Sequence, residues 1–162
     1  MSFEELAMPL FASLYNYARW LTGEPGEAED LVQETYLKAL RGFASFREGT
    51  NFRAWMFRIL RNTFLTSRTG LRATAMRPIE DDDQFVAEGD PETIFLHHAN
   101  AELLRQAILE LPLEFREVLL LADVENMSYR DVSEALSIPV GTVTSRLTRA
   151  RAKVRRRIQE KR

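Results

Sequence analysis

The stretch that decides the fold is NMSYRDVSEALSIPVGTVTSRLTRARAKVRRRI, residues 126–158. Ser128, followed three places later by Asp131, is typical of a helix N-cap with a supporting acid. SIPVG (137–141) turns the chain, and a second helix is expected to begin near Thr142. Inward-facing residues recur at helical spacing in both predicted helices: Val132, Ala135 and Leu136, then Val143, Leu147, Ala150, Val154 and Ile158. This order predicts a helix-turn-helix.

The outer face of the second helix has the chemistry of a DNA-reading surface. Thr144, Ser145, Thr148 and Arg149 point away from the apolar stripe, and arginine can bind a guanine edge through two hydrogen bonds. Other cations on this helix are better placed for phosphates, which position a protein without specifying sequence. The alternative is a helical hairpin in a bundle with a basic tail. The predicted DNA-contacting set is Thr142, Thr144, Ser145, Arg146, Thr148, Arg149, Arg151 and Lys153.

Apolar residues elsewhere also recur at intervals of three and four, and no segment alternates with period two. The sequence therefore predicts an all-α protein. A first helix follows the stripe Leu6, Leu10, Leu14, Ala18 and Leu21 and ends at TGEPG (22–26). A second follows Leu31, Thr35, Leu37 and Leu40, and a third buries Phe52, Trp55, Met56, Ile59 and Leu60.

Periodicity fails from about Gly70 to Ala99, where prolines, glycines and an acidic run at 80–83 give the composition of a linker. Helical pattern resumes at Leu103 and continues after Pro112. We therefore expect two small helical domains joined by a flexible acidic linker, with the helix-turn-helix in the second domain. The boundaries are 1–70, 71–99 and 100–162.

Charge is segregated along the 162 residues, although the net charge is only −2. Residues 41–70 carry six arginines against one acid, 71–139 carry fifteen acids against five bases, and 140–162 carry nine bases against one acid. Two cationic patches divided by an anionic stretch suggest two contacts with a polyanion. The plainer alternative is an unevenly charged solvated surface.

The first cationic patch includes GTNFRAWMFRILRNTF (49–64), which combines arginines, aromatics and asparagines and has no acid. Single-stranded nucleic acids bind cationic grooves in which side chains address unstacked bases. The candidates here are Phe46, Arg47, Arg58, Arg61 and Asn62. Asn62 has an equal alternative as a helix-terminal cap, and Phe46 as a loop residue tucked against the first helices.

Enzymatic and membrane functions find little support. His97 and His98 are adjacent and cannot easily share a metal, and Asp81–Asp83 lacks the ligand spacing of a calcium loop. The chain has no cysteine, no phosphate-cradling glycine motif and no nucleophile elbow. We therefore expect no catalytic site, cofactor or metal. The N-terminus does not read as a signal peptide, and no apolar run is long enough to insert in a membrane.

Three segments together resemble bacterial RNA polymerase sigma factors of the extracytoplasmic-function (ECF) group of the sigma-70 family. They are AEDLVQETYLKAL (28–40), SFREGTNFRAWMFRILRNTF (45–64) and VGTVTSRLTRAR (140–151). The resemblance implies a cytoplasmic, non-catalytic protein that directs promoter recognition, DNA melting and transcription initiation in a stress response. The partners it implies are core RNA polymerase (the β′ clamp and the β subunit), promoter DNA and an anti-sigma factor.

The resemblance also implies roles for particular residues. Asp30, Gln33 and Glu34 would face the β′ clamp, the alternative being a solvated polar face. Asn62 and the Phe46–Arg47 loop would hold a flipped base of the −10 element, while Ser145 and Arg149 would contact −35 bases. Thr144 and Thr148 depart from the larger or basic side chains of many relatives, which affects the −35 bases read. The acidic linker would mimic RNA in the polymerase, or serve only as a spacer.

Two functions of other classes remain open. A stand-alone helix-turn-helix regulator would bind palindromic duplex DNA without polymerase. A sigma-mimicking module would sequester an anti-sigma protein and never touch DNA.

Overall fold

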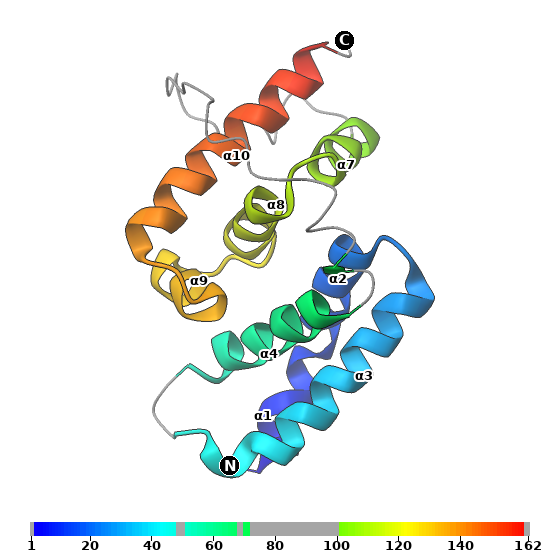
Figure 1. The fold of residues 1–162 in the computed structure, drawn as a ribbon, viewed down its shortest axis with the longest axis vertical. Helices are drawn as coiled ribbons and strands as arrows, with labels where there is room; N and C mark the ends of the chain where they lie inside the picture. The colour runs from blue at the N-terminus through cyan, green and yellow to red at the C-terminus, as the bar shows by residue number, and fades with distance from the viewer. Residues whose placement is uncertain (1, 48–50, 68–69, 72–100, 161–162) are drawn as a thin grey trace.

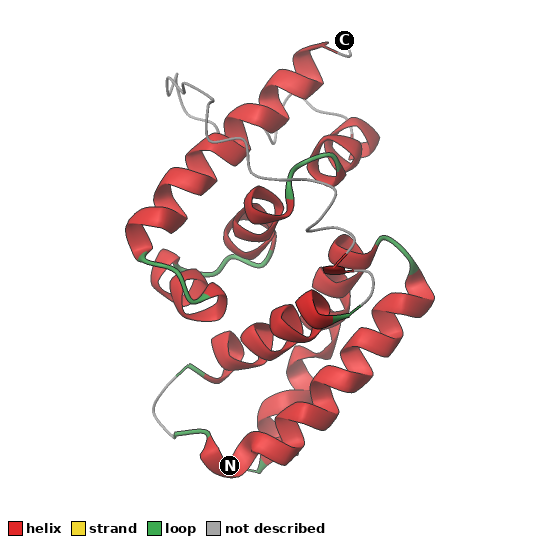
Figure 2. Cartoon of the chain, in the orientation of Figure 1, coloured by secondary structure: helices red, strands yellow, loops and turns green. Residues whose placement is uncertain are grey.

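The computed structural model describes residues 2–47, 51–67, 70–71 and 101–160, and within these ranges every regular element is a helix (Figure 2). The helices form two lobes (Figure 1). The N-terminal lobe contains α1 to α4 and the C-terminal lobe contains α7 to α10. The all-α prediction is confirmed. The predicted linker after Leu71, together with Asp81–Asp83, His97 and His98, lies outside the described residues.

The N-terminal lobe begins with α1 (Phe3–Ala7), the 3₁₀ turn η1 (Met8–Leu10) and α2 (Phe11–Thr22). The sequence predicted one continuous first helix, but Pro9 lies at the start of η1 and interrupts it. Proline has no N–H to donate and clashes with the preceding turn, which explains the break. α2 ends at Gly23, whose φ of 76° is a left-handed conformation that glycine adopts without strain.

Helix α3 (Pro25–Gly42) is capped by Glu24, whose carboxylate accepts hydrogen bonds from the N–H groups of Gly26 and Glu27. These two bonds lower the pKa of Glu24. The predicted inward stripe was partly wrong, since Leu37 and Leu40 are 48% and 57% exposed. The buried face is formed by Ala28, Leu31, Val32, Thr35 and Ala39.

The turn η2 (Phe43–Ser45) and helix α4 (Phe52–Thr66) complete the N-terminal lobe. Asn51 caps α4 by accepting the N–H of Ala54 at 2.9 Å. Phe52, Met56 and Leu60 are buried as predicted, and Trp55 and Ile59 are partly buried against the core. Phe57 and Phe64 are also fully buried, although the predicted stripe did not include them.

The C-terminal lobe contains α7 (Ala101–Leu109), α8 (Leu113–Leu119), α9 (Tyr129–Leu136) and α10 (Val140–Glu160). One π-helical turn, η3 (Leu120–Val124), extends α8. Ser128 caps α9 as predicted, accepting the N–H of Asp131 at 3.1 Å. The predicted inward residues of both α9 and α10 are buried. The helix-turn-helix is therefore confirmed, with α10 beginning two residues before the expected start.

The two lobes pack against each other, and α4 lies beside α9 (Figure 1). This packing explains why α4 is buried on more than one side. One side faces α2 and α3 of its own lobe, and another faces the C-terminal lobe.

Candidate nucleic-acid and polymerase interfaces

Helix α10 presents the hydroxyl-rich face that the sequence predicted. Thr144 and Ser145 are exposed, while Thr142, Thr148 and Arg149 are partly exposed. The hydroxyls of Thr144, Ser145 and Thr148 donate to backbone carbonyls of the preceding turn, at 2.9 to 3.2 Å. Each oxygen keeps lone pairs that can accept a hydrogen bond from a base or a bound water. The face is thus equipped to read base edges.

Two of the predicted phosphate-binding cations on α10 have partners within the C-terminal lobe. Arg151 forms two hydrogen bonds with the carboxylate of Asp123, at 2.6 and 3.0 Å. This carboxylate raises the pKa of Arg151 above its ordinary value. The ammonium of Lys153 lies 5.5 Å from the ring centroid of Phe115, a cation–π geometry. Both side chains therefore hold α10 against the turn η3 and α8. Arg146 is partly exposed on the same helix.

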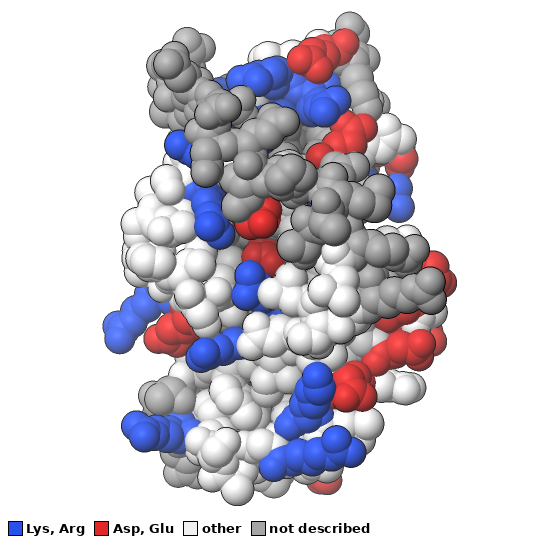
Figure 3. All heavy atoms as spheres, viewed as in Figure 1, with Lys and Arg blue, Asp and Glu red and all other residues white. Residues whose placement is uncertain are grey.

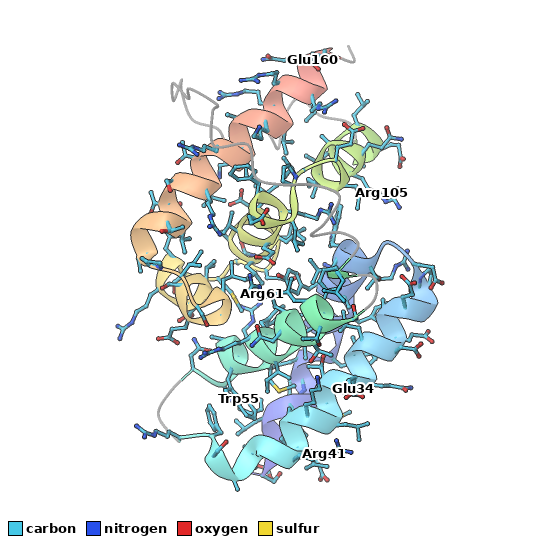
Figure 4. All side chains as sticks on the ribbon, viewed as in Figure 1. Glu34, Arg41, Trp55, Arg61, Arg105 and Glu160 are labelled. Atoms are coloured by element: carbon cyan, nitrogen blue, oxygen red, sulfur yellow. The ribbon has the colours of Figure 1, made fainter. Side chains whose placement is uncertain are left out.

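The predicted site residues of helix α4 lie in two different environments, the exposed surface and the junction between the lobes. Arg58 and Asn62 are exposed. The helix continues to Thr66, and its C-cap is Ser67, so Asn62 does not cap the helix. Arg61, in contrast, lies at the junction with the C-terminal lobe (Figure 4). Its Nε donates to Glu117 Oε1 at 3.1 Å.

Phe46 belongs to an aromatic cluster at the start of α4. Its ring centroid lies 5.1 Å from those of Phe52 and Trp55, and it stacks on Phe43 at 6.2 Å. The alternative of a loop residue tucked against the N-terminal helices thus describes its position. Arg47, next in the chain, is exposed.

Helix α3 places Asp30, Gln33 and Glu34 together on its exposed side. The same side carries an apolar groove of about 870 Å³ that the sequence reasoning missed. Hereafter we call it the α3 groove; its lining includes Met8, Phe11, Tyr15, Gln33, Leu37 and Leu40. At about 100° per residue, Leu37 lies about 120° and Leu40 about 180° around the helix from Leu31, a signal available from the sequence.

Known proteins share this arrangement of segments. The family model for Sigma-70 region 2 matches residues 9–74, and that for Sigma-70 region 4 matches residues 101–154. The EcfG sigma factor of Rhodopseudomonas palustris is 38% identical over 143 residues, which cover 88% of this chain and 77% of that protein. The chain belongs to the ECF sigma factors.

Two further relatives of this sigma factor extend the comparison. The ECF sigma factor SigE of Mycolicibacterium smegmatis is 35% identical over 95% of this chain, which spans 60% of the length of SigE. The sigma factor RpoE of Bartonella quintana, solved in complex with the anti-sigma factor NepR, has a TM-score of 0.74 and 26% identity. That similarity covers 99% of this chain and 98% of RpoE, so it includes both lobes.

Ion pairs join the two lobes of this sigma factor. Besides the bond between Arg61 and Glu117, Nη2 of Arg53 donates to the backbone oxygen of Glu125 at 2.8 Å and lies 3.5 Å from its carboxylate. Asn16 donates to the other carboxylate oxygen of Glu125 at 3.2 Å. In Figure 3, acidic and basic atoms adjoin near the middle of the molecule. Two of the three arginines of the acid-free helix α4 are thus paired with acids of the other lobe.

Burial sets the electrostatics of this junction. The side chain of Glu117 is 1% exposed and that of Arg61 is 22% exposed. Burial raises the pKa of Glu117, and the attraction of Arg61 opposes that rise only in part. The phenol of Tyr17, which is also buried at the junction, has its pKa raised well above the usual value, mainly by burial and then by the charge of Glu117.

Neither a metal centre nor a membrane span is found within the described residues. Among them, no three histidine, cysteine, aspartate or glutamate side chains gather closely enough to hold a metal ion. The helices of this same part of the chain are all too short or too polar to cross a membrane.

Proposed function

We propose that this chain is a promoter-specificity subunit of bacterial RNA polymerase that acts in a stress response in the cytoplasm. One observation carries the proposal: three exposed faces of different chemistry lie on three helices. The α3 face is apolar with an acidic rim, the α4 face carries Arg58 and Asn62, and the α10 face carries hydroxyls and Arg149. A protein that joins a polymerase to two DNA elements needs one such face for each. The proposed domain division remains 1–70, 71–99 and 100–162.

The C-terminal lobe reads the −35 element in this proposal. Helix α10 enters the major groove with Ser145 and Arg149 against base edges, and Thr144 and Thr148 add hydroxyl contacts. Arg146 and the helix end near Thr142 bind phosphates. Because Arg151 and Lys153 already have partners within the lobe, they orient α10 and contribute less to phosphate binding.

The N-terminal lobe captures the −10 element. Asn62, Arg58 and Arg47 lie on exposed surface and receive the non-template strand and its flipped base. Flipping a base out of the stack costs a few kcal/mol, roughly, which binding to this surface must offset. Phe46 supports the site by packing against Phe52 and Trp55 at the start of α4, next to Arg47. Arg61 joins the site when its ion pair with Glu117 opens.

Core polymerase binds the α3 face. Asp30, Gln33 and Glu34 make polar contacts with the β′ clamp, and Leu37 and Leu40 supply apolar area. The C-terminal lobe contacts the β subunit. An anti-sigma factor is a further partner, since the Bartonella quintana relative was solved with one.

Run-off transcription with core polymerase tests the proposal. The full chain should co-purify with core polymerase and direct initiation from promoters with defined −10 and −35 elements. A chain that binds palindromic duplex DNA alone, without supporting initiation, would instead be a stand-alone regulator. A chain that binds an anti-sigma protein but neither core polymerase nor DNA would be a sequestering module.

A further inference from the structure

The junction between the lobes pairs two of the three positive charges of helix α4. Two arginines of α4 pair with two glutamates of the other lobe: Arg61 with Glu117 at 3.1 Å, and Arg53 with Glu125 at 3.5 Å. Both glutamates are more than nine-tenths buried, with 1% and 8% of their side chains exposed, whereas the arginines are 22% and 34% exposed. The acids are thus enclosed by the lobe contact, and the arginines remain near solvent.

We propose that Glu117 and Glu125 form an intramolecular latch that holds the two lobes closed by binding Arg61 and Arg53 in place of DNA phosphate. The inference deepens the proposed function and rests on it. A carboxylate and a phosphate oxygen are alternative anionic partners for the same guanidinium. While Glu117 holds the Nε of Arg61, that N–H is not available to a DNA strand.

The contacts also show why the latch can open. Glu117 Oε2 and the hydroxyl of Tyr17 are buried and have no hydrogen-bond partner among the described residues. Such groups lose hydration in the closed state without full compensation, and they regain it when the lobes separate. The pairs therefore specify how the lobes meet, while the buried polar atoms lower the stability of the closed form.

Closure and DNA binding must then oppose each other. If DNA takes Arg61 only in the open form, DNA shifts the lobes open, and any change that opens the lobes strengthens DNA binding by the same factor. The two glutamates of the latch thus compete with DNA for the arginines of α4. Promoter contact by α4 therefore depends on the partner that first separates the lobes.

A pair of spin labels measures the lobe separation directly in the full chain. The sequence has no cysteine, so Ala44→Cys and Glu134→Cys give two unique labels at exposed positions, one on each lobe. We expect a short, narrow distance distribution in the otherwise unaltered chain. Arg53→Glu places two carboxylates together and should raise the ratio of open to closed molecules by about 5- to 150-fold.

Three further variants make the result specific. Arg41→Glu makes the same charge change on α3, far from the junction (Figure 4), and should leave the distance unchanged. The double variant Arg53→Glu, Glu125→Arg, which swaps the two charges, should restore the short distance. Arg61→Gln probes the second pair separately and should also lengthen the distance, provided that circular dichroism shows a folded chain.

Addition of a random-sequence single-stranded DNA should lengthen the distance in the labelled chain, and Arg53→Glu should reduce this response. The proposal is overturned if the labelled chain is already open, if Arg53→Glu and Arg61→Gln leave the distance unchanged, or if Arg41→Glu opens the lobes equally. These distances need no polymerase, whereas holoenzyme assembly with core polymerase reports on the proposed function. A failure of the latch proposal can therefore be told apart from a failure of the proposed function.

Discussion

Replacing Leu37 and Leu40 with alanine tests whether the α3 groove binds core polymerase. The two leucines are 48% and 57% exposed, so about half of each residue's surface remains for a partner to cover. Complete burial of a leucine side chain contributes roughly 1.5–3 kcal/mol. Half of that is about 1 kcal/mol for each residue and about 2 kcal/mol for the pair.

This energy corresponds to a loss of roughly 10- to 30-fold in affinity for core polymerase, since each 1.4 kcal/mol is about tenfold. Fluorescence anisotropy of the labelled chain titrated with core polymerase measures it. The fold should be unaffected, because both leucines lie outside the buried face of α3.

Leu71→Ala is the matched control, because Leu71 is 60% exposed, follows α4 in the chain and does not line the α3 groove. It should bind core polymerase as the unaltered chain does. Unchanged affinity in the Leu37→Ala, Leu40→Ala double variant, or an equal loss in Leu71→Ala, would refute the assignment of this surface to the polymerase.

Four other outcomes follow from the site and the junction. Arg149→Ala should lose about 1–3 kcal/mol of −35 recognition in run-off transcription while core binding stays intact; loss of core binding would contradict the division of roles. Asn62→Ala should assemble normal holoenzyme but lose a roughly tenfold preference among −10 variants; an undiminished preference would count against the base-binding site. Burial raises the pKa of Glu117, so the folded state binds its proton more tightly than the unfolded chain does. That contribution to stability is complete below the ordinary pKa of a glutamate in the unfolded chain, and it is lost as pH rises through the raised pKa of the folded state. Glu117→Gln should therefore flatten the pH dependence of the urea unfolding midpoint between these two pKa values. A pH profile identical to that of the unaltered chain would exclude this contribution of Glu117. Finally, Arg146→Gln should reduce by about 0.9 the slope of the logarithm of the duplex-binding constant against the logarithm of the salt concentration. Arg151→Gln should leave this slope nearly unchanged, and equal reductions would show that Arg151 reaches phosphate.

The helix-turn-helix was predictable because its determinants are local. The cap of α9 depends on two residues three places apart, and the stripe of α10 repeats over about four turns of one helix. No contact with another part of the chain is needed to place either feature. The Asn51 cap of α4 is equally local, although we did not predict it from the sequence.

The inward stripe predicted for α3 was wrong at Leu37 and Leu40, for a physical reason that the sequence does contain. Leucines were assigned to the core because they are apolar, but small residues form much of the buried face. Ala28 and Ala39 are both fully buried where α3 packs against its neighbours, while Leu37 and Leu40 point outward. Small side chains let helices approach closely, and large apolar ones left outside form an exposed apolar patch of the kind that marks an interaction site.

The partners of the arginines could not be predicted, because they are set by contacts between distant segments. Arg61 and Glu117 are 56 residues apart, and Arg53 and Glu125 are 72 apart. Charge counts predicted that the patch containing α4 contacts a polyanion. They did not show that the protein supplies anionic partners from its own C-terminal lobe.

The location of each carboxylate decides whether its arginine can reach DNA. Asp123 belongs to the same lobe as Arg151, and its two hydrogen bonds help to fix the recognition helix, so separating the lobes leaves that pair intact. Glu117 belongs to the lobe opposite Arg61, so the same separation breaks that pair and frees the guanidinium. In the proposed latch, two arginines that look alike in the sequence therefore differ in role: Arg151 keeps its partner in both forms, and Arg61 becomes available to DNA only in the open form.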